Sequence, residues 1–121
     1  MAKILIIDDE LKLRETIREL LSFTGYDVIE AQNGLEGLQK VKEFLPDLIM
    51  CDIMMPKLDG YGFMEAHLLS EYSDIPVIFA TAKIPLSDEK KAFALGVRGY
   101  FKKPFIYKEL LQAISQHINP S

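Results

Sequence analysis

The sequence lacks the features that mark secreted, membrane-inserted and nucleic-acid-binding proteins. Its single cysteine, Cys51, cannot form a disulfide within the chain, which is typical of a protein kept in the reducing cytoplasm. No apolar run reaches membrane-spanning length, and the apolar segment at residues 4–7 is too short for a signal peptide. No basic run is interleaved with aromatic residues, and 18 acidic against 14 basic residues give a net charge of −4. We therefore expect neither membrane insertion nor direct binding of nucleic acid.

The chain has the length and composition of one globular domain. Of its 121 residues, 49% are hydrophobic and 26% are charged, which suits a buried core under a charged surface. It contains no internal repeat, low-complexity tract or linker. The sequence therefore predicts a single domain over residues 1–121, with no output domain.

Strand-like apolar runs alternate with segments of helical periodicity along the chain. The strands are expected at residues 3–8, 26–31, 47–52, 75–81 and 97–102. A first helix carries Leu13, Ile17, Leu20 and Leu21 on its apolar face, and a second, with Asn33 as N-cap, carries Leu35, Leu38, Val41 and Leu45. Three more helices are expected over residues 60–72, 87–96 and 107–118.

This alternation predicts an α/β domain with a doubly wound parallel sheet. The strands are apolar almost throughout, which indicates that helices cover both faces of the sheet. Five strands are too few for an eight-stranded barrel and match the flavodoxin-like strand order 2-1-3-4-5. Ligands bind at the carboxyl ends of the strands in such sheets, between strands 1 and 3.

Polar side chains stand at the predicted strand ends. Asp8 and Asp9 follow the first strand, Asp52 follows the third, Thr81 ends the fourth, and Lys103 follows the fifth. Three carboxylates at one edge would repel one another unless a hard divalent cation bound there, and Mg²⁺ prefers oxygen ligands of this kind. Taken singly, the acids could merely cap a helix, Thr81 could bond locally and Lys103 could be a solvated surface lysine. Together they favour a functional site.

Other protein classes share parts of this pattern. A haloacid-dehalogenase-type phosphatase also uses an aspartate at a strand end, but it needs a second acid where this chain has Met54. A flavodoxin-type electron carrier needs a loop rich in glycine and hydroxyl groups after the first strand, where this chain has Asp8 and Asp9. A domain of this fold in which the strand-end residues have lost their chemistry is a third alternative.

Four segments carry a resemblance to a known family. They are residues 4–10, 52–60, 80–82 and 100–105, and in this order they resemble the receiver domain of two-component response regulators over essentially the whole chain. The resemblance implies a phosphoacceptor signalling switch rather than an enzyme acting on small molecules. Asp52 would accept a phosphoryl group from a phosphohistidine of a sensor histidine kinase or phosphotransfer protein, and autodephosphorylation would be slow.

The resemblance also implies roles for the residues around Asp52. Asp9 and Asp52 would bind Mg²⁺ directly (Mn²⁺ can substitute), with Asp8 acting through water and the backbone carbonyl of Met54 as a further ligand. Lys103 and Thr81 would bind phosphate oxygens.

A switch is implied as well. Movement of Thr81 would let Tyr100 turn inward and reshape the surface of the fourth helix, fifth strand and fifth helix, which would contact a target protein or output domain. Tyr100 could equally be an ordinary strand aromatic. Lys103-Pro104 is a candidate cis peptide, also by resemblance.

Four further expectations concern single residues. Cys51 is expected in the core, whereas His67 and His117 are expected at the surface. Met54 and Lys83, each two residues beyond a predicted site residue, are expected to slow the attack of water on the phosphorylated aspartate.

Overall fold

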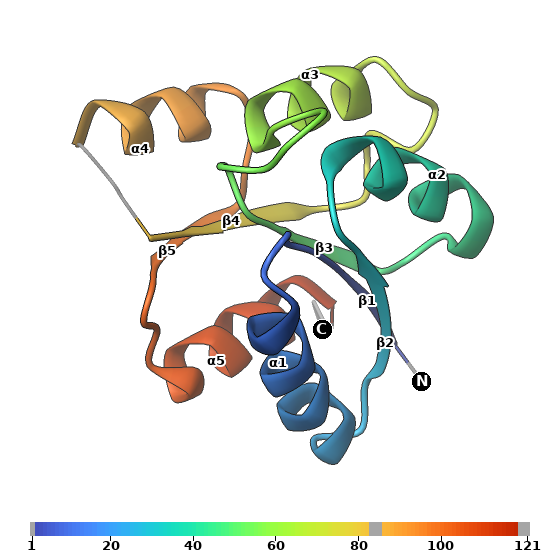
Figure 1. The fold of residues 1–121 in the computed structure, drawn as a ribbon, viewed down its shortest axis with the longest axis vertical. Helices are drawn as coiled ribbons and strands as arrows, with labels where there is room; N and C mark the ends of the chain where they lie inside the picture. The colour runs from blue at the N-terminus through green and yellow to red at the C-terminus, as the bar shows by residue number, and fades with distance from the viewer. Residues whose placement is uncertain (1, 83–85, 119–121) are drawn as a thin grey trace.

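The computed structural model describes residues 2–82 and 86–118 and contains the predicted alternation of strands and helices (Figure 1). The elements are β1 (Lys3–Ile7), α1 (Leu11–Phe23), β2 (Asp27–Ala31), α2 (Gly34–Phe44), β3 (Leu48–Cys51), α3 (Gly60–Leu68), β4 (Val77–Thr81), α4 (Leu86–Ala94), β5 (Gly99–Lys102) and α5 (Tyr107–Ile118). The strands form one parallel sheet in the order β2-β1-β3-β4-β5. The predicted doubly wound α/β fold is therefore confirmed.

The strand register brings the carboxyl ends of the central strands to one edge of the sheet. Ile7, the last residue of β1, is level with Cys51, the last residue of β3. The backbone continues this alignment, because the Asp52 amide donates to the Ile7 carbonyl at 2.8 Å. At the other side of the sheet, the Lys103 amide donates to the Thr81 carbonyl at 2.8 Å. Side chains that follow these strands therefore start from neighbouring positions.

Successive residues of a strand point alternately into two separate hydrophobic cores. Leu5 and Ile7 of β1 point to the face covered by α2, α3 and α4, whereas Ile4 and Ile6 point to the face covered by α1 and α5 (Figure 1). This is the alternation expected of a strand with helices on both sides. Cys51 is fully buried in the first core, as predicted.

The predicted apolar face of α2 is partly wrong. Leu35 and Leu45 are more than half exposed, while Gly34, Gly37 and Val41 are buried. α2 lies so close to the sheet at Gly37 that a Cβ there would come within 2.5 Å of Cδ1 of Ile7. The side that contacts the core is therefore marked by glycines, which a search for apolar periodicity passes over.

α3 is shorter than the predicted helix over residues 60–72. It starts as expected after Asp59, whose side chain accepts a hydrogen bond from the Gly62 amide at 2.8 Å. It ends at Leu68, and the Ser70 side chain forms hydrogen bonds with backbone groups just beyond that point. The Ser70 hydroxyl donates to the His67 carbonyl at 2.7 Å and accepts from the Tyr72 amide at 3.1 Å, which favours a turn over a further helical turn.

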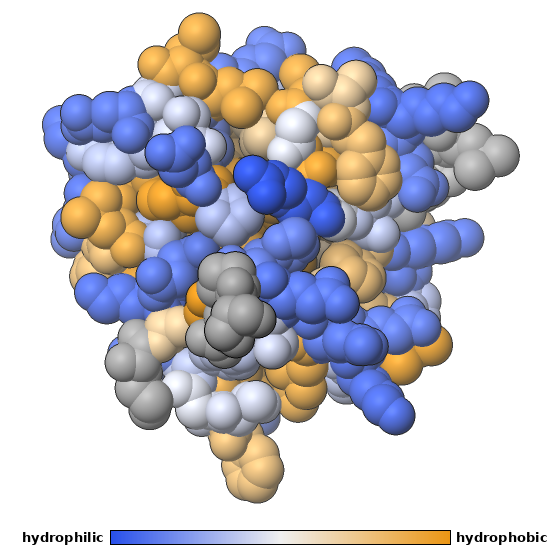
Figure 2. All heavy atoms as spheres, turned by 180° about the vertical axis from the view of Figure 1, so that it is seen from behind, coloured by the Kyte–Doolittle hydropathy of each residue, from blue (hydrophilic) through white to orange (hydrophobic). Residues whose placement is uncertain are grey.

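The rear surface is mostly hydrophilic, with apolar side chains gathered near the top, over α3 (Figure 2). Leu68 and Leu69, at the end of this helix, are among the exposed large hydrophobic residues. Within residues 2–82 and 86–118, no helix has both the length and the apolar character needed to cross a membrane.

Candidate functional site

Asp8 directly follows β1, and every polar atom of this residue has a partner. Its amide donates to the Ala31 carbonyl at 3.0 Å, which continues the pairing of β1 with β2. Oδ1 accepts from the Glu10 amide at 2.9 Å, a local turn that holds the chain between β1 and α1. Oδ2 accepts from Lys103 Nζ at 2.7 Å, and the carbonyl accepts from Arg14 Nη1 at 2.6 Å. The side chain is buried and its orientation is fixed from several sides.

Asp52 directly follows β3 and is also buried. Oδ1 accepts from the Ile53 amide at 2.7 Å, and Oδ2 accepts from Lys103 Nζ at 3.2 Å. Burial raises the pKa of the Asp52 carboxyl, and the charge of Asp8 raises it further, while Lys103 lowers it in part. A buried carboxylate with a raised pKa is more basic than an ordinary aspartate, and a more basic carboxylate is a better nucleophile.

Lys103 connects these two carboxylates across the end of the sheet. Burial alone would lower the pKa of its ammonium group, but the hydrogen bond to Asp8 and the charges of Asp8 and Asp52 raise it above the ordinary value. Lys103 is therefore a cation in the folded protein at neutral pH. The predicted cis peptide bond between Lys103 and Pro104 is present.

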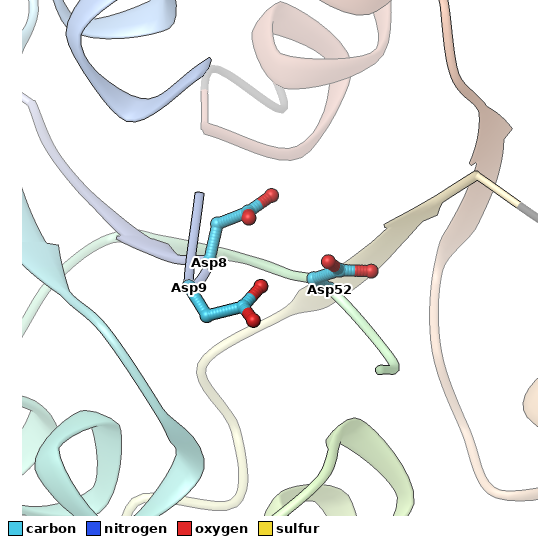
Figure 3. A group of neighbouring side chains, drawn as sticks. All are labelled: Asp8, Asp9 and Asp52. Carbon is cyan, nitrogen blue, oxygen red and sulfur yellow. The ribbon is translucent and has the colours of Figure 1, made fainter. Parts of the chain in front are cut away.

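Asp9 is the exposed member of the acidic group. Asp8 and Asp9 extend from the end of β1 toward the side where Asp52 leaves β3 (Figure 3). One carboxylate oxygen from each of Asp8, Asp9 and Asp52 lies within 4.8 Å of the others. Three negative charges and the one positive charge of Lys103 leave a net charge of −2 in this cluster. The oxygen donors and this charge fit a hard divalent cation such as Mg²⁺.

Thr81 and Tyr100, the predicted switch pair, lie on the adjacent strands β4 and β5. Thr81 is buried at the carboxyl end of β4, level with Lys102. Tyr100 is half-buried, and its ring centroid lies 6.4 Å from those of Phe79 and Phe93. Tyr100 thus contacts the sheet through Phe79 and α4 through Phe93.

The loop after Asp52 is closed by two tight contacts. The Gly60 amide donates to the Ile53 carbonyl at 2.8 Å, and a Cβ at Gly60 would come within 2.5 Å of the Asp52 carbonyl oxygen. The Gly34 amide donates to the Leu58 carbonyl at 3.0 Å, which attaches the same loop to the start of α2. Between these contacts, Met54 is 71% exposed. Lys83, predicted to flank the site with Met54, lies outside the described residues.

The prediction that His67 is a surface residue is wrong. Its side chain is only 1% exposed, its ring stacks on Phe63, and Nε2 lies 2.9 Å from the Ile75 carbonyl oxygen. An imidazole can occupy a core position when a backbone group there satisfies its ring nitrogen. This contact joins α3 to the segment that leads into β4. His117 is partly exposed.

Two residues beside the acidic cluster did not stand out in the sequence. Arg14 of α1 contacts the Asp8 carbonyl, and it pairs with Glu30 of β2. Both are ordinary charged residues in elements that have many of them. Only the parallel pairing of β1 with β2 brings Glu30 close to the end of β1.

Comparison with known proteins agrees with this geometry. Residues 4–115 match the family model of the response regulator receiver domain. The chain is 46% identical over 108 residues to "Probable transcriptional regulator ycf27" of Porphyridium aerugineum, which covers 89% of this chain and 44% of that protein. The chain thus spans about half the length of the curated relatives it matches.

Solved structures share the whole fold. A response regulator receiver domain protein from Clostridium thermocellum superposes with a TM-score of 0.89 at 32% identity, covering 99% of this chain and 96% of that one. The receiver domain of a sensor histidine kinase from Pseudomonas aeruginosa, solved with a magnesium ion coordinated in its active site cleft, gives a TM-score of 0.88 at 26% identity over 97% of each chain. With its family match over residues 4–115, this chain belongs to the response regulator receiver domains of two-component signal transduction.

Proposed function

We propose that the protein is a phosphoacceptor switch in which the Asp52 carboxylate takes a phosphoryl group from a phosphohistidine. The observation that carries this proposal is the position of Asp52, which is buried at a strand end beside Lys103 and within a cluster of three carboxylates. Structural carboxylates are seldom gathered and buried in this way, because their mutual repulsion and desolvation cost stability. A functional demand for negative charge at this place explains the arrangement.

The transfer exchanges one bond to phosphorus for another. An oxygen of the ionised Asp52 carboxylate attacks the phosphorus atom, the P–N bond to the donor imidazole breaks, and the imidazole nitrogen keeps the electron pair and takes up a proton. The product on this chain is an acyl phosphate. Such a transfer depends mainly on positioning and on compensation of charge, which the fixed carboxylate and Lys103 can supply.

Asp8, Asp9, Asp52 and the Met54 carbonyl would hold Mg²⁺, and Mn²⁺ could replace it. When bound, the ion supplies positive charge that offsets the carboxylates and the incoming phosphoryl group. The net charge of −2 on the acidic cluster supports this assignment, as does the magnesium-bound structure of the receiver domain from Pseudomonas aeruginosa.

Lys103 and Thr81 would bind oxygens of the phosphoryl group on Asp52. The Lys103 ammonium can exchange its contact with Asp52 for a phosphate oxygen, since its hydrogen bond to Asp8 keeps it in place. The Thr81 hydroxyl, on the neighbouring strand β4, would donate to another phosphate oxygen. A shift of Thr81 would be passed to Tyr100 on β5 and from there, through Phe93, to α4.

The partners proposed on this basis are proteins. The phosphoryl donor is a sensor histidine kinase or a histidine phosphotransfer protein, and the surface of α4, β5 and α5 contacts a downstream protein or an output domain. The protein is a substrate that assists its own phosphorylation and slow dephosphorylation, not an enzyme with a separate product.

The test is to incubate the protein with a small-molecule phosphodonor and Mg²⁺ and to measure its intact mass. We expect a mass gain of one phosphoryl group that is lost in Asp52→Ala and without Mg²⁺. No gain in the native sequence, or an equal gain in Asp52→Ala, would overturn the proposal.

A further inference from the structure

Arg14 joins three elements behind the acidic cluster. It lies near the start of α1, and its side chain is only 11% exposed. Nη1 donates to the backbone carbonyl of Asp8 at 2.6 Å, while Nε donates to Oε1 of Glu30 on β2 at 3.1 Å. The guanidinium plane thus contacts the end of β1 and the edge strand at the same time. This use of two separate donors in a fixed orientation is possible for arginine and not for lysine.

Glu30 keeps Arg14 in this position. Its Oε1 takes the Arg14 bond, and its Oε2 accepts from Nη1 of Arg18 at 3.0 Å. The two arginines differ in their surroundings, because Arg18 is 58% exposed and has only Glu30 as a charged partner in the described structure. An exposed ion pair of that kind contributes little, whereas the Arg14 contacts are largely shielded from water.

Arg14 makes a side-chain hydrogen bond to the backbone carbonyl of Asp8, where the turn to Glu10 begins. Glu10 is the N-cap of α1, and its side chain makes no capping hydrogen bond. Besides Arg14 on the Asp8 carbonyl, three hydrogen bonds hold the turn: the Asp8 amide donates to the Ala31 carbonyl, the Glu10 amide donates to Asp8 Oδ1, and Lys103 donates to Asp8 Oδ2. Asp9 lies between these two fixed residues. The direction of its exposed carboxylate therefore depends on how firmly they are held.

We propose that Arg14 is a positioning residue that sets the divalent-cation affinity of the Asp8, Asp9 and Asp52 site. It contacts neither the metal nor the phosphoryl group, and it acts by fixing the backbone from which Asp8 and Asp9 extend. The inference rests on the proposed function, because it assumes that these carboxylates bind Mg²⁺. Residues that orient metal ligands in this way typically change metal affinity about 10-fold to 100-fold when they are removed.

The test measures Mg²⁺ affinity by calorimetric titration of the full chain, well below the unfolding temperature of each variant. We expect Arg14→Ala to weaken Mg²⁺ binding about tenfold. Arg14→Lys should recover only part of the affinity, because its ammonium group cannot reproduce the two-directional contact. The matched control is Arg18→Ala, which removes the other partner of Glu30 and should change the affinity less than about twofold.

A second readout needs no metal. Hydrogen exchange of the Glu10 amide, which donates to Asp8 Oδ1, should become faster in Arg14→Ala and stay unchanged in Arg18→Ala. If Arg14→Ala does not fold, Glu30→Gln takes its place and should weaken Mg²⁺ binding by a smaller factor.

The outcomes separate the two proposals. Folded Arg14→Ala with native Mg²⁺ affinity, or Arg18→Ala with the same loss as Arg14→Ala, would overturn the role of Arg14 and leave the proposed function intact. A native protein that binds no Mg²⁺ would overturn the metal site and this inference together.

Discussion

The Lys103 ammonium group lies closer to Asp8 than to Asp52. Nζ is 2.7 Å from Oδ2 of Asp8 and 3.2 Å from Oδ2 of Asp52. The first distance is that of a strong charge-assisted hydrogen bond, and the second is longer than such bonds usually are. Oδ1 of Asp52 is held by the Ile53 amide at 2.7 Å. Oδ2 of Asp52 is therefore the more weakly held oxygen, and we expect it to attack phosphorus.

Replacing Lys103 by methionine should have opposite effects on stability and on metal binding. Asp8 and Asp52 would lose their common cation, and leaving buried charges without a partner should lower the free energy of unfolding of the metal-free protein by about 3 kcal/mol. The affinity for Mg²⁺ should rise, because the cluster charge changes from −2 to −3. Urea unfolding with and without Mg²⁺ measures both effects. The control is Lys102→Met at the exposed neighbouring position, and equal stability of the two variants would contradict the prediction.

Replacing Asp52 by asparagine should stabilise the metal-free protein at neutral pH. Burial and the charge of Asp8 raise the pKa of Asp52 above its ordinary value of 3.8. A carboxyl whose pKa is higher in the folded chain favours folding below its unfolded-state pKa, and this contribution is lost as pH rises through the folded-state pKa. At pH 7 the ionised group therefore costs stability.

The expected result for Asp52→Asn is a higher Tm than the native protein at pH 7 and no such gain below pH 3.8. Thermal unfolding in chelator across this pH range measures it. Asp74→Asn, at an exposed position, should show no gain at either pH. A native-like or lower Tm for Asp52→Asn at pH 7 would contradict the prediction.

Replacing Met54 by asparagine should shorten the lifetime of the phosphorylated state. The exposed methionine side chain lies two residues beyond Asp52 and cannot orient a water molecule, whereas an amide can. We expect dephosphorylation to be up to about tenfold faster, equivalent to about 1.4 kcal/mol in the barrier. Loss of the phosphorylated mass over time, after removal of the phosphodonor, measures the rate. Mg²⁺ affinity should not change, because only the backbone of residue 54 is proposed as a ligand; an unchanged lifetime would exclude this role.

Replacing Gly37 by alanine tests the observed packing of α2. The new Cβ would lie 2.5 Å from Cδ1 of Ile7 and 3.3 Å from Cε1 of Phe63, so one of these core residues must move. We expect a loss of about 1–3 kcal/mol in unfolding free energy, despite the higher helix propensity of alanine. Leu35→Ala, on the exposed side of the same helix, should change stability by less than about 0.5 kcal/mol. If the predicted apolar face of α2 were correct, Leu35→Ala would lower the unfolding free energy more than Gly37→Ala.

The sequence predicts the position of a candidate site residue correctly where its polar side chain directly follows a recognisable apolar strand. Asp8 and Asp52 directly follow apolar strands, so the parallel sheet alone brings them to one edge. Gly37 shows the limit of this reasoning, because a close approach of helix and sheet leaves no apolar residue to detect. His67 shows another, since its burial depends on the carbonyl of Ile75, which is positioned only by the folded loop.

The role of Arg14 could not be predicted from the sequence for a third reason. Its partners, the Asp8 carbonyl and the Glu30 carboxylate, are a backbone atom and a residue 16 positions away on another strand. No spacing within α1 distinguishes Arg14 from Arg18, although one is largely buried and the other is exposed. Only the pairing of β1 with β2 separates them.

The closed loop after Asp52 also bears on how such a switch can be retuned. Gly60 allows the chain to return against Asp52 and Ile53, and the contact of Gly34 with Leu58 holds the far side. Backbone contacts close this loop, and within it Met55 packs against the core while Met54 is exposed. The Met54 side chain can therefore be replaced without loss of a core contact, whereas the Met55 side chain cannot. We therefore expect substitution of Met54 to change the lifetime of the proposed phosphorylated state while Asp52, its charge and its geometry stay the same.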